Sequence, residues 1–424
     1  MSTEQNRGVA ISGQFLADVR TAYLKWFGKG YDLQVLEAVL AAAAAEQLGG
    51  DPPWLLVVGG SGAAKTETIM PLQGINDDRA IVTSTITGEA ALLSGTPESE
   101  RTKGATGGLL RKMGDGGILV IKDVTSILSM SRDARASVLA ALREIYDGRW
   151  EREIGAEGGK TLSWKGRIVV IGGVTTAWDS AHSVISMMGD RFVLVRFNSK
   201  ENRREAGRQA LRNVGKEEKM RAELKAAVER LLDQAKDAEV ELTDDDSDRI
   251  LDLANLVTLA RTAVERDFSG NVVQAHDPES PTRFTKQLAQ IFRGGLAIGM
   301  THDDAMDTAC RCAGDTMPPL RLQILADVAK HPKTATKDVT KRTQVPRKTT
   351  DRALQELHLL GLLKIDYEEY GEGKERWLYS IAEPDDVEVI RKLVRTPTAT
   401  CIVCGDSMQV YMDDQTMHPN CEPS

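Results

Sequence analysis

The chain has 424 residues, too many for one ordinary hydrophobic core, so two to four domains are expected. With 41% hydrophobic and 27% charged residues it has the composition of a globular protein, and no apolar run reaches the roughly 18–20 residues that a membrane-spanning helix needs. A net charge of −8 excludes a uniformly basic, histone-like binder. The five cysteines do not form a disulfide framework, and the polar first residues are not a secretory signal. We therefore expect a cytoplasmic protein without a membrane partner.

The first three-quarters of the chain is predicted to form three units. Residues 1–50 read as an N-terminal helical segment that ends at the helix-stop signal Gly49-Gly50. In residues 51–200, short apolar runs alternate with helical stretches, which is typical of an α/β fold with a parallel sheet. Residues 201–317 form a helical unit, and 243–312 in particular read as all-helical. The runs expected to be strands are Trp54–Val58, Ala80–Ser84, Ile118–Ile121, Ile168–Ile171 and Phe192–Phe197.

Two smaller units are expected to follow. Residues 318–390 read as three helices and then two strands around Tyr370–Gly373, which is the element order of a winged helix-turn-helix. A linker at Arg395–Thr398 leads into a short tail at 396–424, which contains cysteines and a histidine.

A glycine-rich loop between the first strand and the next helix carries the main functional signal. Glycines let successive backbone N–H groups turn toward phosphate oxygens, and the start of a helix adds a favourable dipole. Lys65 is expected to reach the β- and γ-phosphates of ATP, and Thr66 to bind Mg²⁺. Ala64 replaces the usual glycine before the lysine; the alternative interpretation is a strand-to-helix turn with a chance lysine. The nucleotide-binding residues predicted here are Gly59, Gly60, Ser61, Gly62, Ala63, Ala64, Lys65 and Thr66.

Three residues near the ends of later strands are candidates for catalysis. Asp123 follows Ile118–Ile121 and could bind a metal or a water; alternatively, it caps the next helix. Thr175 follows Ile168–Ile171 and could place a hydroxyl near the γ-phosphate. Arg191 precedes the last strand and could reach the γ-phosphate of a neighbouring subunit, although an ordinary surface arginine is the alternative.

Together these motifs resemble the minichromosome maintenance (MCM) helicases, which are AAA+ ATPases. The loop at 59–66 looks like the family's phosphate loop, in which alanine also precedes the lysine. The resemblance covers about residues 50–300. The other segments that carry it are Gly104–Leu110 and Asp115–Ile118, which resemble the approach to the family's acidic strand, Arg143–Arg149 and Lys165–Arg167, which resemble its pre-sensor hairpin, and Pro281–Arg283, which looks like the start of its second-sensor helix.

The resemblance implies an AAA+ core at 51–200, a helical lid at 201–317 and a hexameric ring with ATP and Mg²⁺ between subunits. Thr175 stands where the family has its sensor asparagine, Arg191 where it has its arginine finger, and Arg283 where it has its second sensor. Two departures concern hydrolysis: Lys122 replaces the metal-binding aspartate, and Asp123 stands for the catalytic glutamate. Compact chains of this kind resemble the MCM-like proteins of phages and mobile elements.

Two basic regions are candidates for contacting DNA. Lys160 follows the glycine-rich tip of a hairpin predicted at Trp150–Trp164, where a pore loop would contact a single strand; a solvated lysine is the alternative. Arg347, Lys348 and Arg352 are expected on the outer face of a helix that a winged helix-turn-helix would place on duplex DNA. Alternatively, this unit contacts protein.

The tail contains two ligand pairs for a metal ion. Cys401 and Cys404 are followed, after thirteen residues, by His418 and Cys421. Thiolates and an imidazole at this spacing predict a structural, tetrahedral Zn²⁺ site, because a tail this short would hardly fold without a metal. The alternative is a set of unconnected thiols.

The sequence therefore predicts an ATP-dependent, DNA-associated AAA+ motor, namely a hexameric, MCM-like DNA helicase in the replication of phage or mobile DNA. The alternative is an ATP-binding DNA adaptor, or a regulator of replication or transcription, in which Lys122 replaces the charge of the metal ion and ATP is hydrolysed weakly or not at all.

Overall fold

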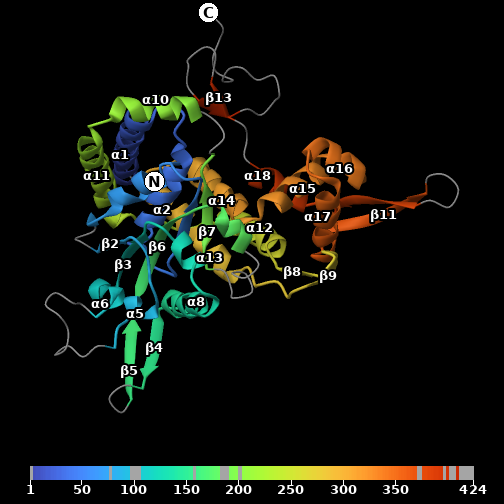
Figure 1. Cartoon of the computed structure of the whole chain (residues 1–424). Coiled ribbons are helices and arrows are strands. Elements are labelled where there is room, and N and C mark those ends of the chain that lie inside the picture. Colours follow the sequence, from blue (N-terminus) through green and yellow to red (C-terminus); the bar gives the residue numbers. More distant parts are fainter. Residues whose placement is uncertain are drawn as a thin grey trace, which may run out of the picture.

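The computed structural model describes residues 3–75, 79–95, 107–155, 159–181, 191–198, 203–369, 375–394, 398–400 and 407–409. A central sheet and its covering helices form the body, a long two-stranded hairpin projects from it, and a C-terminal unit lies to one side (Figure 1). None of the described helices is long and apolar enough to cross a membrane.

The central sheet has five parallel strands in the order β2-β3-β6-β1-β7. The prediction of an α/β fold with a parallel sheet is confirmed. Four strands match the predicted runs to within two residues at each end, because buried parallel strands are continuous apolar runs. The strands are β1 (Trp54–Val58), β2 (Ala80–Thr83), β3 (Gly116–Ile121), β6 (Arg167–Val174) and β7 (Val193–Arg196).

Strand β6 extends three residues beyond the predicted run and includes two glycines. A Cβ atom at Gly172 would lie 2.7 Å from Val124, and one at Gly173 would lie 2.8 Å from the carbonyl oxygen of Lys122. The glycine pair therefore lets the turn that follows β3 approach β6 closely. A run defined by apolar side chains ends before these glycines.

Helices cover both faces of the sheet. One face packs against α2 (Leu33–Ala44) and α13 (Thr282–Ala297), and the other packs against α8 (Arg132–Tyr146). The predicted segment 1–50 contributes directly to this core, because α2 is buried along almost its whole length. At the contact between α2 and α13, a Cβ atom at Gly294 would lie 2.0 Å from the carbonyl oxygen of Ala41, so only glycine permits this approach.

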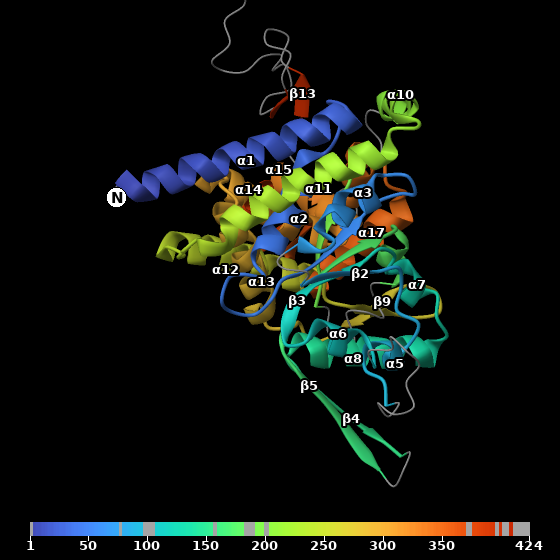
Figure 2. The same cartoon turned by 90° about the vertical axis from the view of Figure 1, so that its left-hand side faces the viewer.

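The remaining helices of the body lie around the sheet. Helix α1 (Thr3–Phe27) packs along α11 (Glu217–Gln234), next to α10 (Arg203–Asn213), as Figure 2 shows. Helices α12 (Asp244–Ala260) and α14 (His302–Thr316) flank α13. Short elements complete the body: α3 (Lys65–Ile69), η1 (Met70–Leu72), α5 (Glu89–Leu92), α6 (Leu109–Met113), α7 (Thr125–Leu128) and η4 (Ala235–Asp237).

The prediction that 243–312 is all-helical is wrong at one place. Strands β8 (Val264–Arg266) and β9 (Val272–Ala275) form an antiparallel hairpin between α12 and α13. The Asp267 carboxylate accepts hydrogen bonds from Asn271, and Gly270 has a positive φ, so a tight turn interrupts the helices.

The C-terminal unit consists of three helices and a three-stranded antiparallel sheet in the order β10-β12-β11. The three helices and strands β11 and β12 follow the predicted order, but the short strand between α15 and α16 was not predicted; α18 (Asp386–Leu393) packs back on α14 and α15. The elements are α15 (Pro319–Lys330), β10 (Thr334–Ala335), α16 (Thr336–Thr343), α17 (Arg347–Leu359), β11 (Leu363–Glu369) and β12 (Glu375–Ile381). The strand pair β13 (Thr398–Thr400) and β14 (Ser407–Gln409) follows, and residues Tyr370–Gly373, around which the two strands were predicted, lie outside the described residues.

The projecting hairpin is formed by β4 (Arg149–Ile154) and β5 (Lys160–Lys165), as predicted for 150–164. It points away from the body in both views (Figures 1 and 2). Trp150 and Trp164 are buried opposite each other at its base, and the indole of Trp164 donates to the carbonyl oxygen of Gly114 at 2.7 Å.

Candidate functional site

The predicted catalytic residues lie at two opposite edges of the central sheet. Strand register places Val58 beside Val174, so Gly59 and Thr175 follow at the same level. Ile121 lies beside Gly172, which brings the turn at Asp123 to the same edge. These are the carboxyl ends of β1, β3 and β6, where open parallel sheets bind ligands. We call this side the nucleotide edge.

The loop at residues 59–66, which is predicted to bind phosphates, is a tight, solvent-accessible turn. Gly62 and Ala64 both have positive φ values, 78° and 58°. Alanine rarely adopts this backbone conformation, whereas glycine does so without strain. The sequence departs from the usual glycine at this position, and the backbone nevertheless keeps the conformation that glycine would favour. Ser61 and Thr66 are exposed at the surface of the loop.

Lys65 folds over the loop that contains it. Its ammonium group donates to the carbonyl oxygens of Gly59 and Gly60, each at 2.7 Å. Partial burial lowers the pKa of Lys65, and the nearby Asp123 carboxylate opposes this effect. Lys65 and Asp123, which are predicted to bind ATP and its Mg²⁺, therefore lie close together at the nucleotide edge.

Asp123 and Thr175 are connected through Thr125. The Oδ1 atom of Asp123 accepts the backbone N–H of Thr125, the first residue of α7, at 2.9 Å, while Val124 holds the N-cap position of that helix. The hydroxyl of Thr125 accepts the backbone N–H of Thr175 at 3.1 Å. This bond engages one carboxylate oxygen, and Asp123 remains exposed, so it stays a candidate for metal binding. Sequence reasoning missed Thr125, although its place two residues after Asp123 was a signal.

A partly buried network of charges joins the nucleotide edge to the helical unit. Both terminal nitrogens of Arg196, at the end of β7, donate to Asp179, which follows Thr175 by four residues. The backbone N–H of Arg196 donates to Asp315 of α14 at 2.6 Å. Arg311, also of α14, donates to Asp32 through both terminal nitrogens. Sequence reasoning missed these residues, because ion pairs between distant segments leave no local pattern.

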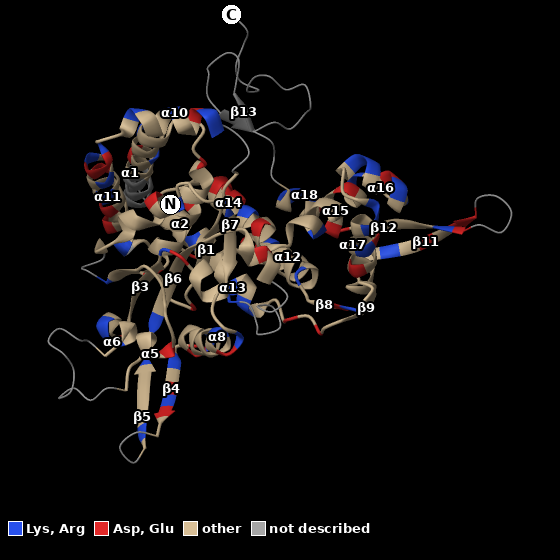
Figure 3. Cartoon of the chain, viewed as in Figure 1, with Lys and Arg blue, Asp and Glu red and all other residues tan. Residues whose placement is uncertain are grey.

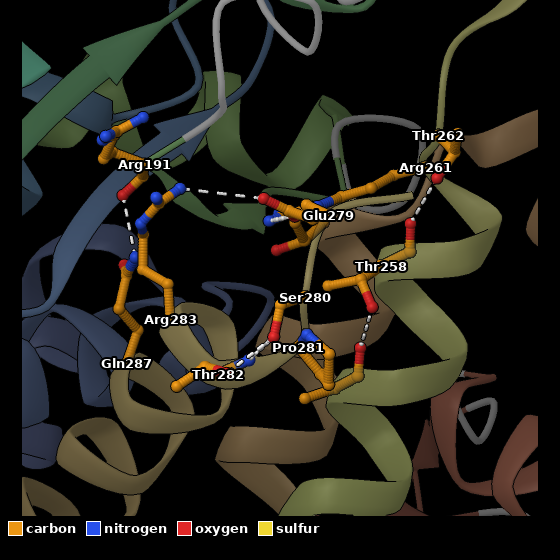
Figure 4. A network of polar contacts seen from close by, with 12 residues as sticks. Arg191, Thr258, Arg261, Thr262, Glu279, Ser280, Pro281, Thr282, Arg283 and Gln287 are labelled. Atoms are coloured by element: carbon orange, nitrogen blue, oxygen red, sulfur yellow. Dashed lines mark hydrogen bonds and ion pairs between the residues drawn. The ribbon is translucent and has the colours of Figure 1, made fainter. Parts of the chain in front are cut away.

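Arg191 and Arg283 lie together at the other edge, among the amino ends of the strands, which we call the arginine edge (Figure 4). Arg191 lies 3.6 Å from Asp147, and its backbone carbonyl accepts the side chain of Gln287 at 3.0 Å. Arg283 lies 3.8 Å from Glu279 and above the ring of Tyr146. Burial lowers the pKa of Arg191, and the charge of Arg283 acts in the same direction.

The two edges are far apart within one chain. Leu55 lies beside Val193, so Arg191 is level with Pro53, six residues before Gly59. At about 3.3 Å per residue, this is roughly 20 Å along the strand. An arginine at one edge cannot touch a phosphate bound at the other edge of the same chain. If Arg191 contacts a nucleotide, that nucleotide must therefore be bound to a second subunit.

The DNA-contacting candidates lie outside both edges. Lys160 is exposed near the end of the projecting hairpin, opposite Ile154, while residues 156–158 of the tip lie outside the described residues. Arg347 and Lys348 are exposed at the start of α17, as expected. Arg352 differs from the expectation: its guanidinium donates to the carbonyl oxygen of Ser269, so the β8–β9 turn holds it.

The predicted zinc ligands Cys401, Cys404, His418 and Cys421 lie outside the described residues. Among the residues that are described, no group of three or more His, Cys, Asp or Glu is arranged to hold a metal ion. The zinc site therefore stays a prediction.

No protein-family model and no curated protein matches this chain. Among solved structures, a full-length MCM homolog from Methanopyrus kandleri has a TM-score of 0.40 and 11% identity over 72% of this chain. The chain spans 60% of the length of that homolog. The Aeropyrum pernix ORC1 protein in complex with DNA has a TM-score of 0.27 and 13% identity, over 85% of this chain and 91% of that one. At these values neither similarity establishes the family.

Proposed function

We propose that this protein is an ATP-dependent, DNA-associated motor of the AAA+ type, an MCM-like helicase that works as a hexameric ring. The observation that carries the proposal is the separation of the two edges. Lys65, Asp123 and Thr175 lie at one edge, and Arg191 and Arg283 lie at the other, roughly 20 Å away. A head-to-tail interface would place the arginine edge of one subunit on the nucleotide edge of the next, and such interfaces close into rings.

The residues at the nucleotide edge suit ATP with Mg²⁺. The loop is solvent-accessible, and its lysine is held only by carbonyl oxygens of the same loop among the contacts described. Lys65 would bind phosphate oxygens, while Thr66 and Asp123 would hold Mg²⁺. Arg191 and Arg283 would add positive charge from the neighbouring subunit. Hydrolysis of bound ATP would supply the free energy for movement along DNA.

DNA contacts are proposed at two places. The β4–β5 hairpin with Lys160 would contact a single strand inside the ring through its phosphates, without sequence preference. The C-terminal unit would act as a winged helix, with Arg347 and Lys348 at the start of α17 on duplex DNA. The tail would hold one structural Zn²⁺ through Cys401, Cys404, His418 and Cys421.

The test is a steady-state ATPase assay of the full chain with and without single-stranded DNA, together with calorimetric titration of ATP. We expect wild type to bind ATP and to hydrolyse it faster with DNA, and we expect Lys65→Ala to lose both properties while it stays folded. Lys112→Ala removes an exposed lysine from α6 and should behave as wild type. Equal ATP affinity of the Lys65→Ala variant and wild type would contradict the phosphate-loop assignment.

A second candidate function is an ATP-binding DNA adaptor without turnover. The observation that favours it is the pair Lys122-Asp123, which puts a positive charge where the metal ion of a motor would need a carboxylate. Tight ATP binding with no hydrolysis, in the presence and absence of DNA, would support the adaptor over the motor.

A further inference from the structure

The β8–β9 hairpin is fastened to helix α17 by charged contacts. The Glu356 carboxylate of α17 is buried and accepts hydrogen bonds from Arg266 of β8 and from Arg321 of α15. Arg321 also donates to the carbonyl oxygens of Ala260 and Thr262, at 2.8 and 2.6 Å, where α12 ends. Glu356 is buried whereas Arg266 is about half exposed, and the ion pairs of Glu356 with Arg266 and Arg321 join the hairpin to α17 and α15.

The hairpin runs along α17 toward the amino end of that helix. Arg266 contacts Glu356, and Ser269, three residues further along the hairpin, contacts Arg352, one turn earlier in α17. The next turn brings Lys348, about 6 Å further along the axis at 1.5 Å per residue. The tip of the hairpin therefore contacts α17 at Arg352, one turn from the basic start of the helix; Figure 1 shows the hairpin next to α17.

The tip presents a phenylalanine to solvent on a hydrogen-bonded turn. Phe268 is fully exposed, and Val273 of β9 is more than half exposed. The turn beneath is closed by Asp267, whose carboxylate accepts the backbone N–H of Asn271 at 2.7 Å and its side-chain amide at 2.9 Å. Packing does not explain Phe268, because a fully exposed ring buries no apolar surface.

We propose that the β8–β9 tip and the start of α17 form one nucleic-acid-binding surface, in which Phe268 stacks on a base while Arg347 and Lys348 bind phosphates. This inference rests on the proposed DNA binding by α17 and deepens it. Charge favours a polyanion as the occupant: Lys337, Lys341, Arg347 and Lys348 are exposed on α16 and α17, where Figure 3 shows Lys and Arg gathered. The exposed opposing charges are Asp267, whose two oxygens are engaged by Asn271, Glu265 of β8 and Asp338 of α16.

Stacking and phosphate contacts have different signatures. Aromatic stacking depends weakly on salt and tolerates any base, whereas each phosphate contact adds to the salt dependence of affinity. Phe268→Ala should therefore weaken binding at every salt concentration and leave the salt slope unchanged. Lys348→Ala should weaken binding and lower that slope by about one unit.

The experiment measures binding of the full chain to a fluorescein-labelled duplex with a single-stranded overhang, from 50 to 200 mM salt. We expect Phe268→Ala to lose about tenfold or more in affinity, and Phe268→Trp to retain wild-type affinity. Val273→Ala, a neighbouring exposed apolar residue, is the matched control and should bind as wild type. ATP turnover without DNA should be unchanged in all three variants.

Three results separate the possibilities. Unchanged DNA affinity in Phe268→Ala, with reduced affinity in Arg347→Ala and Lys348→Ala, overturns this inference and leaves the proposed DNA binding by α17 intact. Unchanged affinity in all of these variants overturns both. A change in oligomer mass for Phe268→Ala, measured by light scattering without DNA, makes the tip a protein contact and also overturns the inference.

Discussion

Thr125 accepts the backbone N–H of Thr175 through its hydroxyl at 3.1 Å, and this bond ties together the residues that follow two neighbouring strands. The Asp123 carboxylate accepts the backbone N–H of the same threonine. Asp123, predicted to bind a metal or a water, and Thr175, predicted to lie near the γ-phosphate, are therefore both hydrogen-bonded to Thr125. The geometry of the nucleotide edge depends on a side chain that would not itself touch the nucleotide.

Replacing Thr125 by valine should lower ATP turnover while ATP affinity is retained. Valine has nearly the shape of threonine but cannot accept the N–H of Thr175, so Thr175 would shift. A displacement near 1 Å can lower the rate on the order of 10²-fold. Turnover and ATP affinity are measured separately. Ser129→Ala, on the exposed side of the same turn, is the control. A Thr125→Val variant with wild-type turnover would show that the link is dispensable.

Lys122→Asp should make ATP binding depend more strongly on Mg²⁺. The substitution replaces a half-buried lysine with a second carboxylate next to Asp123, and paired carboxylates suit a hard cation. We expect a larger difference between ATP affinities measured with Mg²⁺ and with a chelator, and higher turnover if the missing carboxylate limits hydrolysis. Lys112→Asp makes the same charge change on exposed α6. Identical Mg²⁺ dependence of the two variants would contradict a role for Lys122.

Ala64→Gly should stabilise the free protein slightly. Ala64 has φ 58°, a conformation that costs a residue with a Cβ about 1–2 kcal/mol, while glycine adds about 0.4–1 kcal/mol of chain entropy to the unfolded state. The net gain should be about 0.5–1 kcal/mol in the free energy of unfolding, measured by urea denaturation. Ala63→Gly is the matched control, because Ala63 does not have a positive φ and should lose stability. A loss of stability in Ala64→Gly would mean that the methyl group contributes more than the strain costs.

The sequence predicted the sheet well and the long-range contacts poorly. Trp54–Val58 matches β1 residue for residue, because a strand buried on both faces is an uninterrupted apolar run. The tight turn at residues 59–66 is predictable because glycines are a local signal, and its phosphate binding stays a prediction. The pairing of Arg196 with Asp179 was not predictable, since nothing local distinguishes an arginine that meets a distant carboxylate.

The β8–β9 hairpin shows a different limit. Its turn residues, Asp267 and Gly270, are a local signal that was present in the sequence. The strands are only three and four residues long and lie between long helices, so the pattern of residues 243–312 as a whole favours helix. Arg352 was expected on an open helix face for the same reason, because the hairpin that covers it was not anticipated.

The tail should contain one zinc ion per chain. Elemental analysis of protein purified without chelators should find one equivalent, and Cys404→Ser should lose it, because removing one of four ligands opens a structural site. Cys310→Ser is the control, since its thiol is buried in α14 and is not part of the tail. Protein prepared in this way that contains no zinc would refute the site.

The last prediction concerns Arg191, which tests whether the active site is shared between subunits. Arg191 lies at the arginine edge, close to Asp147 and Arg283, and roughly 20 Å along the sheet from its own phosphate loop. Arg191→Ala should therefore bind ATP with wild-type affinity and lose turnover, by about 10³–10⁵-fold if it acts as arginine fingers do. Arg132→Ala, exposed at the opposite end of α8 from Asp147, is the control and should turn over ATP normally.

Mixing Arg191→Ala with Lys65→Ala subunits should restore part of the activity. In a mixed ring, some interfaces pair an intact phosphate loop from an Arg191→Ala subunit with an intact Arg191 from a Lys65→Ala subunit. Each variant alone lacks such interfaces, so even a small restored fraction stands out against a background lowered by orders of magnitude. Mixed oligomers are verified with two affinity tags before turnover is measured. If they form and stay inactive, while wild type turns over ATP, Arg191 does not complete the site of a neighbour, and the head-to-tail ring loses its principal support.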